Sequence, residues 1–170
     1  MSNIIWFTGL SGTGKTTLCL LLKKELIKKN YKCLLVDGDI FRKKTNQKSF
    51  LKKDIIKNNL SIISFCKKNR TKQDFIIVSV ISPLKKTRFF AQKLFKNNYY
   101  EIKTYSSLKV LEKRDVKGLY KLAKLGKLKN LIGYNSKIKY ETSKHKHLRI
   151  NTGKLSKKES LKKILKYLKI

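Results

Sequence analysis

A glycine-rich run near the amino terminus has the residue types and the spacing of a phosphate-binding loop. The run "GLSGTGKTT", residues 9–17, fits the pattern G-x-x-x-x-G-K-[ST] and lies between an apolar segment and a leucine-rich segment. Glycines let backbone N–H groups surround phosphate oxygens, a lysine at this place bridges the outer phosphates, and the next threonine hydroxyl can bind Mg²⁺. We therefore expect a nucleoside triphosphate to be bound by Gly9, Ser11, Gly12, Thr13, Gly14, Lys15, Thr16 and Thr17.

Two carboxylates stand two positions apart in "VDGDIFR", residues 36–42, although the chain has only 10 Asp and Glu against 43 Lys and Arg. Asp37 and Asp39 follow an apolar run that is typical of a strand, and ligands bind at the carboxyl ends of strands in parallel sheets. One carboxylate can deprotonate an acceptor hydroxyl while the other positions Mg²⁺ or its water. A polar strand exit without chemistry is the alternative interpretation, since Asp-Gly is common in turns.

The phosphate loop alone does not distinguish a kinase from a switch GTPase or a fragment of a motor. A GTPase needs a guanine-specifying N-K-x-D sequence, which this chain lacks, and a motor needs a longer chain. A small kinase needs an acceptor pocket and a carboxylate beside the incoming hydroxyl. We therefore predict a kinase that uses ATP and Mg²⁺, with Lys15 in the catalytic machinery and with Thr16 and Asp37 at the metal, Asp37 directly or through a water.

Strand-like segments alternate with helix-length segments, which predicts an α/β protein of the P-loop kinase fold, with a parallel sheet and helices on both faces. We expect strands at 3–8, 32–37, 74–82, 99–105 and near 147–151, and helices at 15–29, 52–68, 83–96, 107–113 and from 156 onward. The helix at 52–68 carries an apolar stripe of Ile55, Ile56, Leu60, Ile63 and Phe65. Residues 114–139 are basic and punctuated by glycine, which predicts a mobile basic lid within a single domain of residues 1–170.

The formal net charge of +33 invites comparison with nucleic-acid-binding proteins, because basic patches neutralise backbone phosphates. Lysine is spread over every segment in company with many Asn and Ile, a bias that an A/T-rich genome imposes on exposed positions. We therefore expect no nucleic-acid partner, and a field that attracts small anions. We also expect a cytoplasmic protein, because the chain shows no export signal or membrane-spanning run, and its three cysteines, an odd number without metal-type spacing, indicate reduced thiols. His145 and His147 are too few for a metal site.

Four motifs, in order along the chain, resemble those of the adenylylsulfate kinase family: "IWFTGLSGTGKTT", "DGDIFR", "ISP" at 81–83 and "EKRDVKGLYKLAKLGKLKNLIG" at 112–133. The resemblance covers nearly the whole chain. It implies a kinase that transfers phosphate from ATP to the ribose 3′-hydroxyl of adenosine 5′-phosphosulfate, forms a homodimer and closes a lid over both nucleotides. It also implies that Asp39 accepts the hydroxyl proton, that Phe50 stacks on the base, and that the substrate contacts Arg42, Asn58, Ile81, Ser82 and Lys117.

Two departures from the family pattern fall in the acceptor pocket. The family's "GFS-x-x-D-R-x-x-N" stands here as "SFLKKDIIKN", with Ile55 in place of an arginine, and its "GFTG" stands as "NLIG", with Leu131 in place of an aromatic residue. A charge-assisted contact contributes about 1.5 to 3 kcal/mol and a stacked base about 1 to 3 kcal/mol. Losing both weakens adenylyl sulfate binding by about two to four decades unless Lys57 or Tyr134 compensates.

An intact phosphate loop beside an altered acceptor pocket indicates a changed substrate. The pattern is similar to that of the cytidine diphosphoramidate kinase of bacterial capsule biosynthesis, which phosphorylates the 3′-hydroxyl of a cytidine nucleotide. We therefore predict cytidine 5′-diphosphoramidate as the favoured acceptor, with Ile55 and Leu131 among the substrate-binding residues. The alternatives are adenylyl sulfate itself, and a protein that binds a nucleotide or nucleic acid without turnover.

Overall fold

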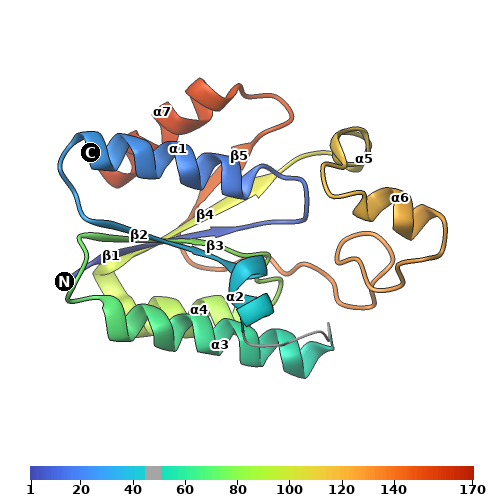
Figure 1. Ribbon diagram of the computed structural model, residues 1–170, viewed down its shortest axis with the longest axis horizontal. Helices are drawn as coiled ribbons and strands as arrows, with labels where there is room; N and C mark the ends of the chain where they lie inside the picture. The colour runs from blue at the N-terminus through green and yellow to red at the C-terminus, as the bar shows by residue number, and fades with distance from the viewer. Residues whose placement is uncertain (45–50) are drawn as a thin grey trace.

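The computed structural model describes residues 1–44 and 51–170 and contains a five-stranded sheet between two layers of helices (Figure 1). The strand order is β2-β3-β1-β4-β5, and all neighbours run parallel, which confirms the predicted α/β fold. The strands are β1 (Asn3–Thr8), β2 (Cys33–Asp37), β3 (Phe75–Ser79), β4 (Tyr99–Tyr105) and β5 (Leu148–Asn151). The helices are α1 (Lys15–Lys28), α2 (Gly38–Lys44), α3 (Lys52–Asn69), α4 (Lys85–Phe95), α5 (Leu108–Arg114), α6 (Leu119–Lys124) and α7 (Lys157–Leu168), with a 3₁₀ turn at Lys96–Asn98.

Each face of the sheet packs on its own pair of helices. Helices α1 and α7 cover one face, and α3 and α4 cover the other (Figure 1). The central strand β1 is fully buried from Ile4 to Phe7, because a strand that is covered on both faces must be apolar at every position. Ile5 and Phe7 join the core under α1 and α7, whereas Ile4 and Trp6 join the core over α3 and α4.

Functional segments gather at the carboxyl edge of the sheet. The phosphate loop follows β1, Asp37 ends β2, and α2, α5 and α6 lie at this same end of the molecule (Figure 1). The two chain termini lie at the opposite end. This arrangement is the one in which parallel sheets bind ligands.

Two boundaries at this edge differ from the sequence prediction. Strand β3 ends at Ser79 and α4 begins at Lys85, so residues 80–84 leave the sheet as an irregular loop, and Pro83 precedes the helix instead of occupying its first turn. Helix α2 is not predicted by the sequence pattern. It begins directly after Asp37, whose Oδ1 accepts hydrogen bonds from the backbone N–H groups of Asp39 at 2.9 Å and Ile40 at 3.3 Å.

Helix α3 turns a different face to the core from the one that its apolar residues suggest. Leu60 and Phe65 are 40% and 37% exposed, so the predicted apolar stripe is wrong at these two positions. Asn58 and Asn59 take part in the buried face, which shifts its phase along the helix. The buried residues, at helical spacing, are Ile55, Asn58, Asn59, Ile62, Ile63 and Cys66.

The predicted lid, residues 114–139, contains α6 and otherwise consists mainly of turns and irregular chain. Its apolar side chains Tyr120, Ala123 and Leu131 form a small cluster with Leu111, and Leu10 of the phosphate loop packs against this cluster. The Tyr120 hydroxyl donates a hydrogen bond to the Ser11 carbonyl oxygen at 2.9 Å. The lid segment therefore rests directly on the phosphate loop.

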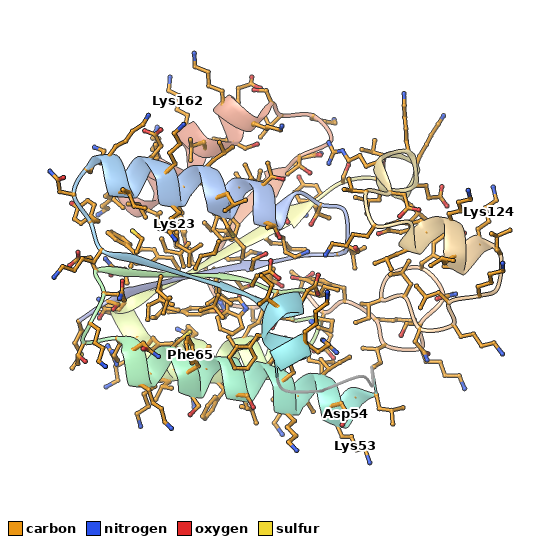
Figure 2. All side chains as sticks on the ribbon, viewed as in Figure 1. Lys23, Lys53, Asp54, Phe65, Lys124 and Lys162 are labelled. Atoms are coloured by element: carbon orange, nitrogen blue, oxygen red, sulfur yellow. The ribbon has the colours of Figure 1, made fainter. Side chains whose placement is uncertain are left out.

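Lysine side chains extend outward over both helix layers and over the lid, as Lys162 of α7, Lys53 of α3 and Lys124 of α6 show (Figure 2). The positive charge is thus spread over these parts of the molecule, as predicted. Within residues 1–44 and 51–170, no helix is both long enough and apolar enough to cross a membrane. Cys19 and Cys66 are buried, and neither they nor Cys33 form a disulfide.

Candidate active site

The phosphate loop joins β1 to α1 and takes a conformation that depends on its glycines. Gly9, Gly12 and Gly14 have φ angles of 144°, 74° and 78°, which residues with a side chain rarely adopt. Gly9 also lies against β4, because a Cβ atom at this position would be only 2.2 Å from the Thr104 carbonyl oxygen. The loop thereby places the amino terminus of α1, a site that favours anions, at the cleft.

Lys15 at the start of α1 folds back over the phosphate loop. Its Nζ donates hydrogen bonds to the carbonyl oxygens of Gly9 at 3.0 Å and Leu10 at 2.8 Å. Burial lowers the pKa of Lys15 from 10.5 to about 8, although the nearby Asp39 carboxylate acts to raise it. The ammonium is a poorly solvated charge, so phosphate oxygens would stabilise it.

Three oxygen-bearing side chains from different elements meet beside the loop. The Thr16 hydroxyl donates a hydrogen bond to Asp37 Oδ2 at 3.1 Å, and it lies 3.1 Å from Ser79 Oγ. Oxygen ligands of this kind fit Mg²⁺, which takes one or two protein ligands and completes its shell with phosphate oxygens and water. No group of three or more His, Cys, Asp or Glu in the described parts of the chain could hold a metal by itself.

Asp39 on the first turn of α2 faces Lys117 of the lid. Its Oδ2 forms an ion pair with Lys117 Nζ, and both side chains are more than half exposed. Desolvation acts to raise the pKa of Asp39, but the hydrogen bond and charge of Lys117, together with the charges of Lys15 and Arg42, outweigh it and lower the pKa. Asp39 is therefore an ionised hydrogen-bond acceptor at neutral pH.

A cleft of about 750 Å³ unites these groups, a size that is ordinary for a small-molecule site. Its lining comes from the phosphate loop and the first turn of α1, from the ends of β2 and β3, and from residues 114–139. The residues of the predicted site that line the cleft are Ser11, Gly12, Gly14, Lys15, Thr16, Thr17, Asp37, Asp39, Ile81, Lys117 and Leu131.

Residues 1–151 match the sequence model of the family described as adenylylsulphate kinase. The chain belongs to the adenylylsulphate kinase family. Among its curated relatives, the adenylyl-sulfate kinase of Bacteroides thetaiotaomicron is 36% identical over 166 residues, which cover 96% of this chain and 82% of the relative. The probable adenylyl-sulfate kinase of Pyrococcus abyssi is 34% identical over 163 residues, which cover 95% of this chain and 92% of that protein. The structure of the Mycobacterium tuberculosis APS kinase in complex with AMPPNP and APS has a TM-score of 0.90 and 28% identity, with 99% of this chain and 98% of that chain covered.

Membership of the adenylylsulphate kinase family confirms the predicted phosphotransferase, which uses ATP and Mg²⁺ and phosphorylates a hydroxyl group. Family membership reverses the predicted preference between the two candidate acceptors. The relatives are adenylyl-sulfate kinases, so they support adenylyl sulfate better than the predicted cytidine 5′-diphosphoramidate.

On the acceptor side of the cleft, the structure brings together only some of the residues predicted to bind substrate. Ile81 and Leu131 line the cleft wall with Asp39 and Lys117. Ile55 is 1% exposed and lies outside the lining, in a buried cluster with Leu84 and Ile132. Ile132 itself lines the cleft, so the position where the family has an arginine is here part of the apolar packing behind the wall.

Asn58 and Ser82 are buried outside the cleft lining, and their side chains have no hydrogen-bond partner within the described residues. Such buried polar groups cost about 1 to 3 kcal/mol each. The predicted stacking residue Phe50 lies outside the described residues. Lys57 is exposed on α3, and Tyr134 packs edge-on against Tyr120 with ring centroids 5.8 Å apart, so neither lines the cleft to replace the missing family side chains.

The cleft also reaches the loop between β5 and α7, a part of the site that the sequence prediction misses. Arg114 Nη1 donates a hydrogen bond to Thr152 Oγ1 at 3.1 Å, and Thr152 Oγ1 donates to the Thr13 carbonyl oxygen at 3.1 Å. Ser156 lines the same end and caps α7, where its Oγ accepts the Glu159 N–H at 3.2 Å. The S-x-x-E pattern could have located this cap, but no local pattern links it to the phosphate loop.

Proposed function

We propose that this chain is an ATP-dependent kinase that phosphorylates the ribose 3′-hydroxyl of adenosine 5′-phosphosulfate. The observation that carries the proposal is the meeting of the phosphate loop, the Thr16–Asp37 pair and Asp39 in one cleft. Phosphoryl transfer needs a cradle for the triphosphate, a position for the metal and a carboxylate at the acceptor hydroxyl. The activity named for the curated relatives supports the choice of acceptor.

Asp39 acts at the acceptor hydroxyl in the proposed reaction. Its carboxylate takes the hydroxyl proton while the 3′-oxygen bonds to the γ-phosphorus of ATP and the bond from that phosphorus to the β,γ-bridging oxygen breaks, which releases ADP. Lys15 stabilises the charge on the transferred phosphoryl group. Thr16 and Asp37 would hold Mg²⁺, which neutralises charge on the phosphate oxygens. Lys117 moves from Asp39 to the charged end of the acceptor.

A second candidate acceptor, cytidine 5′-diphosphoramidate, is favoured by one feature of the cleft wall. Ile55, Leu84 and Ile132 form an apolar cluster where the family pattern has an arginine, and Leu131 lines the cleft where the pattern has an aromatic residue. This wall offers neither a guanidinium for the adenylyl sulfate nor a broad stacking surface for a purine. A smaller pyrimidine nucleotide depends less on both contacts.

Steady-state release of ADP from Mg-ATP tests the two acceptors, when each is offered separately at the same concentration and the position of the new phosphate is read by NMR. At least a tenfold preference for adenylyl sulfate is the expected result. A preference for cytidine 5′-diphosphoramidate would contradict adenylyl sulfate as the acceptor and support the second candidate. Turnover of neither compound would count against both acceptors and favour a binding role. The Lys15→Met variant gives the blank for contaminating ATPase activity.

We also propose that residues 1–170 form one catalytic domain with residues 114–139 as its lid, and that the enzyme works in the cytoplasm as a homodimer. The contacts of Lys117 with Asp39 and of Tyr120 with Ser11 support the lid, because they join this segment to α2 and to the phosphate loop. Light scattering tests the oligomeric state, and a mass of one chain, 19.9 kDa, would contradict the dimer.

A further inference from the structure

Arg88 is a buried arginine that lies behind the cleft wall and outside the cleft lining. It belongs to α4, is 0% exposed, and forms an ion pair with Glu101 of β4, which is 1% exposed, with Nε 3.3 Å from Oε1. Its guanidinium also lies over the ring of Tyr140, 5.1 Å from the centroid. Burying two charges is costly, and apolar residues of similar volume often stabilise a fold equally well or better. The ion pair alone therefore does not account for an arginine at this position.

One nitrogen of the guanidinium, Nη1, binds the loop that follows β3. Arg88 Nη1 donates a hydrogen bond to the Ser82 carbonyl oxygen, and Ser82 has a φ of 43°, which is unusual for a residue other than glycine. The preceding residue, Ile81, lines the cleft. Its carbonyl oxygen accepts hydrogen bonds from Thr8 Oγ1 at 2.6 Å and from the Gly9 N–H at 3.4 Å. Arg88 thus fixes a strained peptide that connects the cleft wall to the start of the phosphate loop.

The other two nitrogens, Nη2 and Nε, bind the segment that follows the lid. Arg88 Nη2 donates to the Glu141 carbonyl oxygen, and Nε donates to Ser143 Oγ at 2.9 Å. Glu141 lies two residues beyond the end of the lid segment, residues 114–139. The Glu141 N–H donates to the Pro83 carbonyl oxygen at 2.8 Å, so the two segments that Arg88 holds are also bonded to each other.

We propose that Arg88 is a positioning residue for the acceptor, because it fastens the β3 exit, residues 81–83, to the chain that follows the lid, residues 140–143. The planar guanidinium donates to two carbonyl oxygens of different segments at once, which the single ammonium of a lysine cannot do with the same geometry. Glu101 fixes its orientation by pairing with Nε and by accepting a hydrogen bond from Ser143 Oγ at 2.6 Å. The position of Ile81 at the acceptor therefore depends on Arg88.

This inference rests on the proposed function for its kinetic readout, and hydrogen exchange provides a readout that does not. In the Arg88→Lys variant, which keeps the charge beside Glu101, we expect backbone hydrogen exchange of residues 80–84 and 140–143 to rise about tenfold or more. We expect the acceptor KM to rise about 10- to 100-fold, because small misplacements near a reacting group are costly. The Kd of Mg-ATP should stay within about twofold. Arg70→Lys, at a half-buried arginine stacked on Phe95, is the matched control and should change none of these values.

The paired variant Arg88→Met with Glu101→Gln removes both charges. It tests whether Arg88 positions the acceptor if the Arg88→Lys variant fails to fold. We expect it to fold and to show the same rise in acceptor KM and in exchange. Unchanged exchange and acceptor KM would overturn the inference. An equal loss of affinity for Mg-ATP and acceptor with a lower melting temperature would also overturn it, because that result indicates a role in stability alone. A wild-type chain that turns over neither acceptor would instead contradict the proposed function, and hydrogen exchange would still test Arg88.

Discussion

The side chains of Lys117 and Asp39 meet across the cleft, although 78 positions separate them in the chain. Lys117 belongs to the lid, whereas Asp39 lies in the first turn of α2, the short helix that follows β2. The contact joins the lid to the carboxylate that we propose as the catalytic base. A charged acceptor that draws Lys117 away would leave Asp39 free to accept the hydroxyl proton.

Replacing Lys117 by Met should change the pH dependence of the reaction. Desolvation acts to raise the pKa of Asp39, and Lys117 makes the leading contributions that lower it, so the pKa should rise in the variant. Activity needs the ionised carboxylate, and the acid limb of the kcat/KM profile should therefore move to higher pH. Loss of the charged contact should reduce kcat/KM at neutral pH about 10- to 100-fold. The Lys117→Arg variant should keep the wild-type limb, and an unmoved limb in Lys117→Met would show that Lys117 does not control Asp39.

The two carboxylate oxygens of Asp37 have different partners, so substitution can separate its cap of α2 from its proposed role at the metal. Oδ1 caps α2 through the Asp39 and Ile40 N–H groups, and Oδ2 accepts a hydrogen bond from Thr16. Asp37→Asn keeps an oxygen for the cap and loses the charge, so we expect a wild-type melting temperature and a half-saturating Mg²⁺ concentration about 10- to 100-fold higher. Asp37→Ala should show the same magnesium effect and lose about 1 kcal/mol of unfolding free energy.

A magnesium titration of activity and a thermal melt of each variant check both roles of Asp37. Asp74→Asn is a suitable control, because Asp74 Oδ2 also accepts a backbone N–H, that of Lys32, but lies outside the cleft lining. Wild-type magnesium dependence in Asp37→Asn would remove Asp37 from the metal site.

The lowered pKa of Lys15 predicts proton uptake when the nucleotide binds. Its pKa is about 8 in the free protein, and bound phosphates should return it toward the ordinary 10.5. Binding of Mg-ATP near pH 8 should therefore take up about half a proton per site, and near pH 6 almost none, because Lys15 is already charged there. Affinity for Mg-ATP should fall as the pH rises above about 8. Calorimetry in buffers of different ionisation enthalpy measures the uptake, and its absence near pH 8 would contradict the lowered pKa.

The sequence predicts the sheet, the main helices and the phosphate loop because each has a local pattern of apolar spacing or glycine placement. The buried face of α3 escapes prediction, because Asn58 and Asn59 lie in it and hydrophobicity alone then gives the wrong phase. The short helix after Asp37 escapes prediction, because its support includes a carboxylate cap from Asp37 and the packing of Phe41 against Phe65 of α3, which a seven-residue pattern does not reveal. Contacts such as that of Arg88 with Glu141 join distant segments, and no local pattern encodes them.

Ile55 and Ile132 share one buried cluster, which predicts that their substitutions are coupled. Ile55→Arg places an unpaired charge among apolar side chains and should cost at least about 3 kcal/mol of unfolding free energy. Adding Ile132→Thr, which restores the family pattern at both positions, should recover part of that loss and increase the preference for adenylyl sulfate over the cytidine nucleotide. Leu60→Arg, on the exposed side of α3, should change stability by less than about 0.5 kcal/mol. Thermal melts and the ratio of kcat/KM values check both effects, and additive effects on stability would contradict the coupling.

Single-turnover phosphoryl transfer by the Asp39→Asn variant tests most directly whether this cleft uses Asp39 as its base. The measurement uses saturating Mg-ATP and the acceptor that the wild type turns over faster, with Glu112→Gln, an exposed carboxylate on α5, as the control. We predict a fall in rate of about 10²- to 10⁴-fold with unchanged Mg-ATP affinity, and a wild-type rate in the control. A rate in Asp39→Asn within about twofold of the wild type would contradict the role of Asp39.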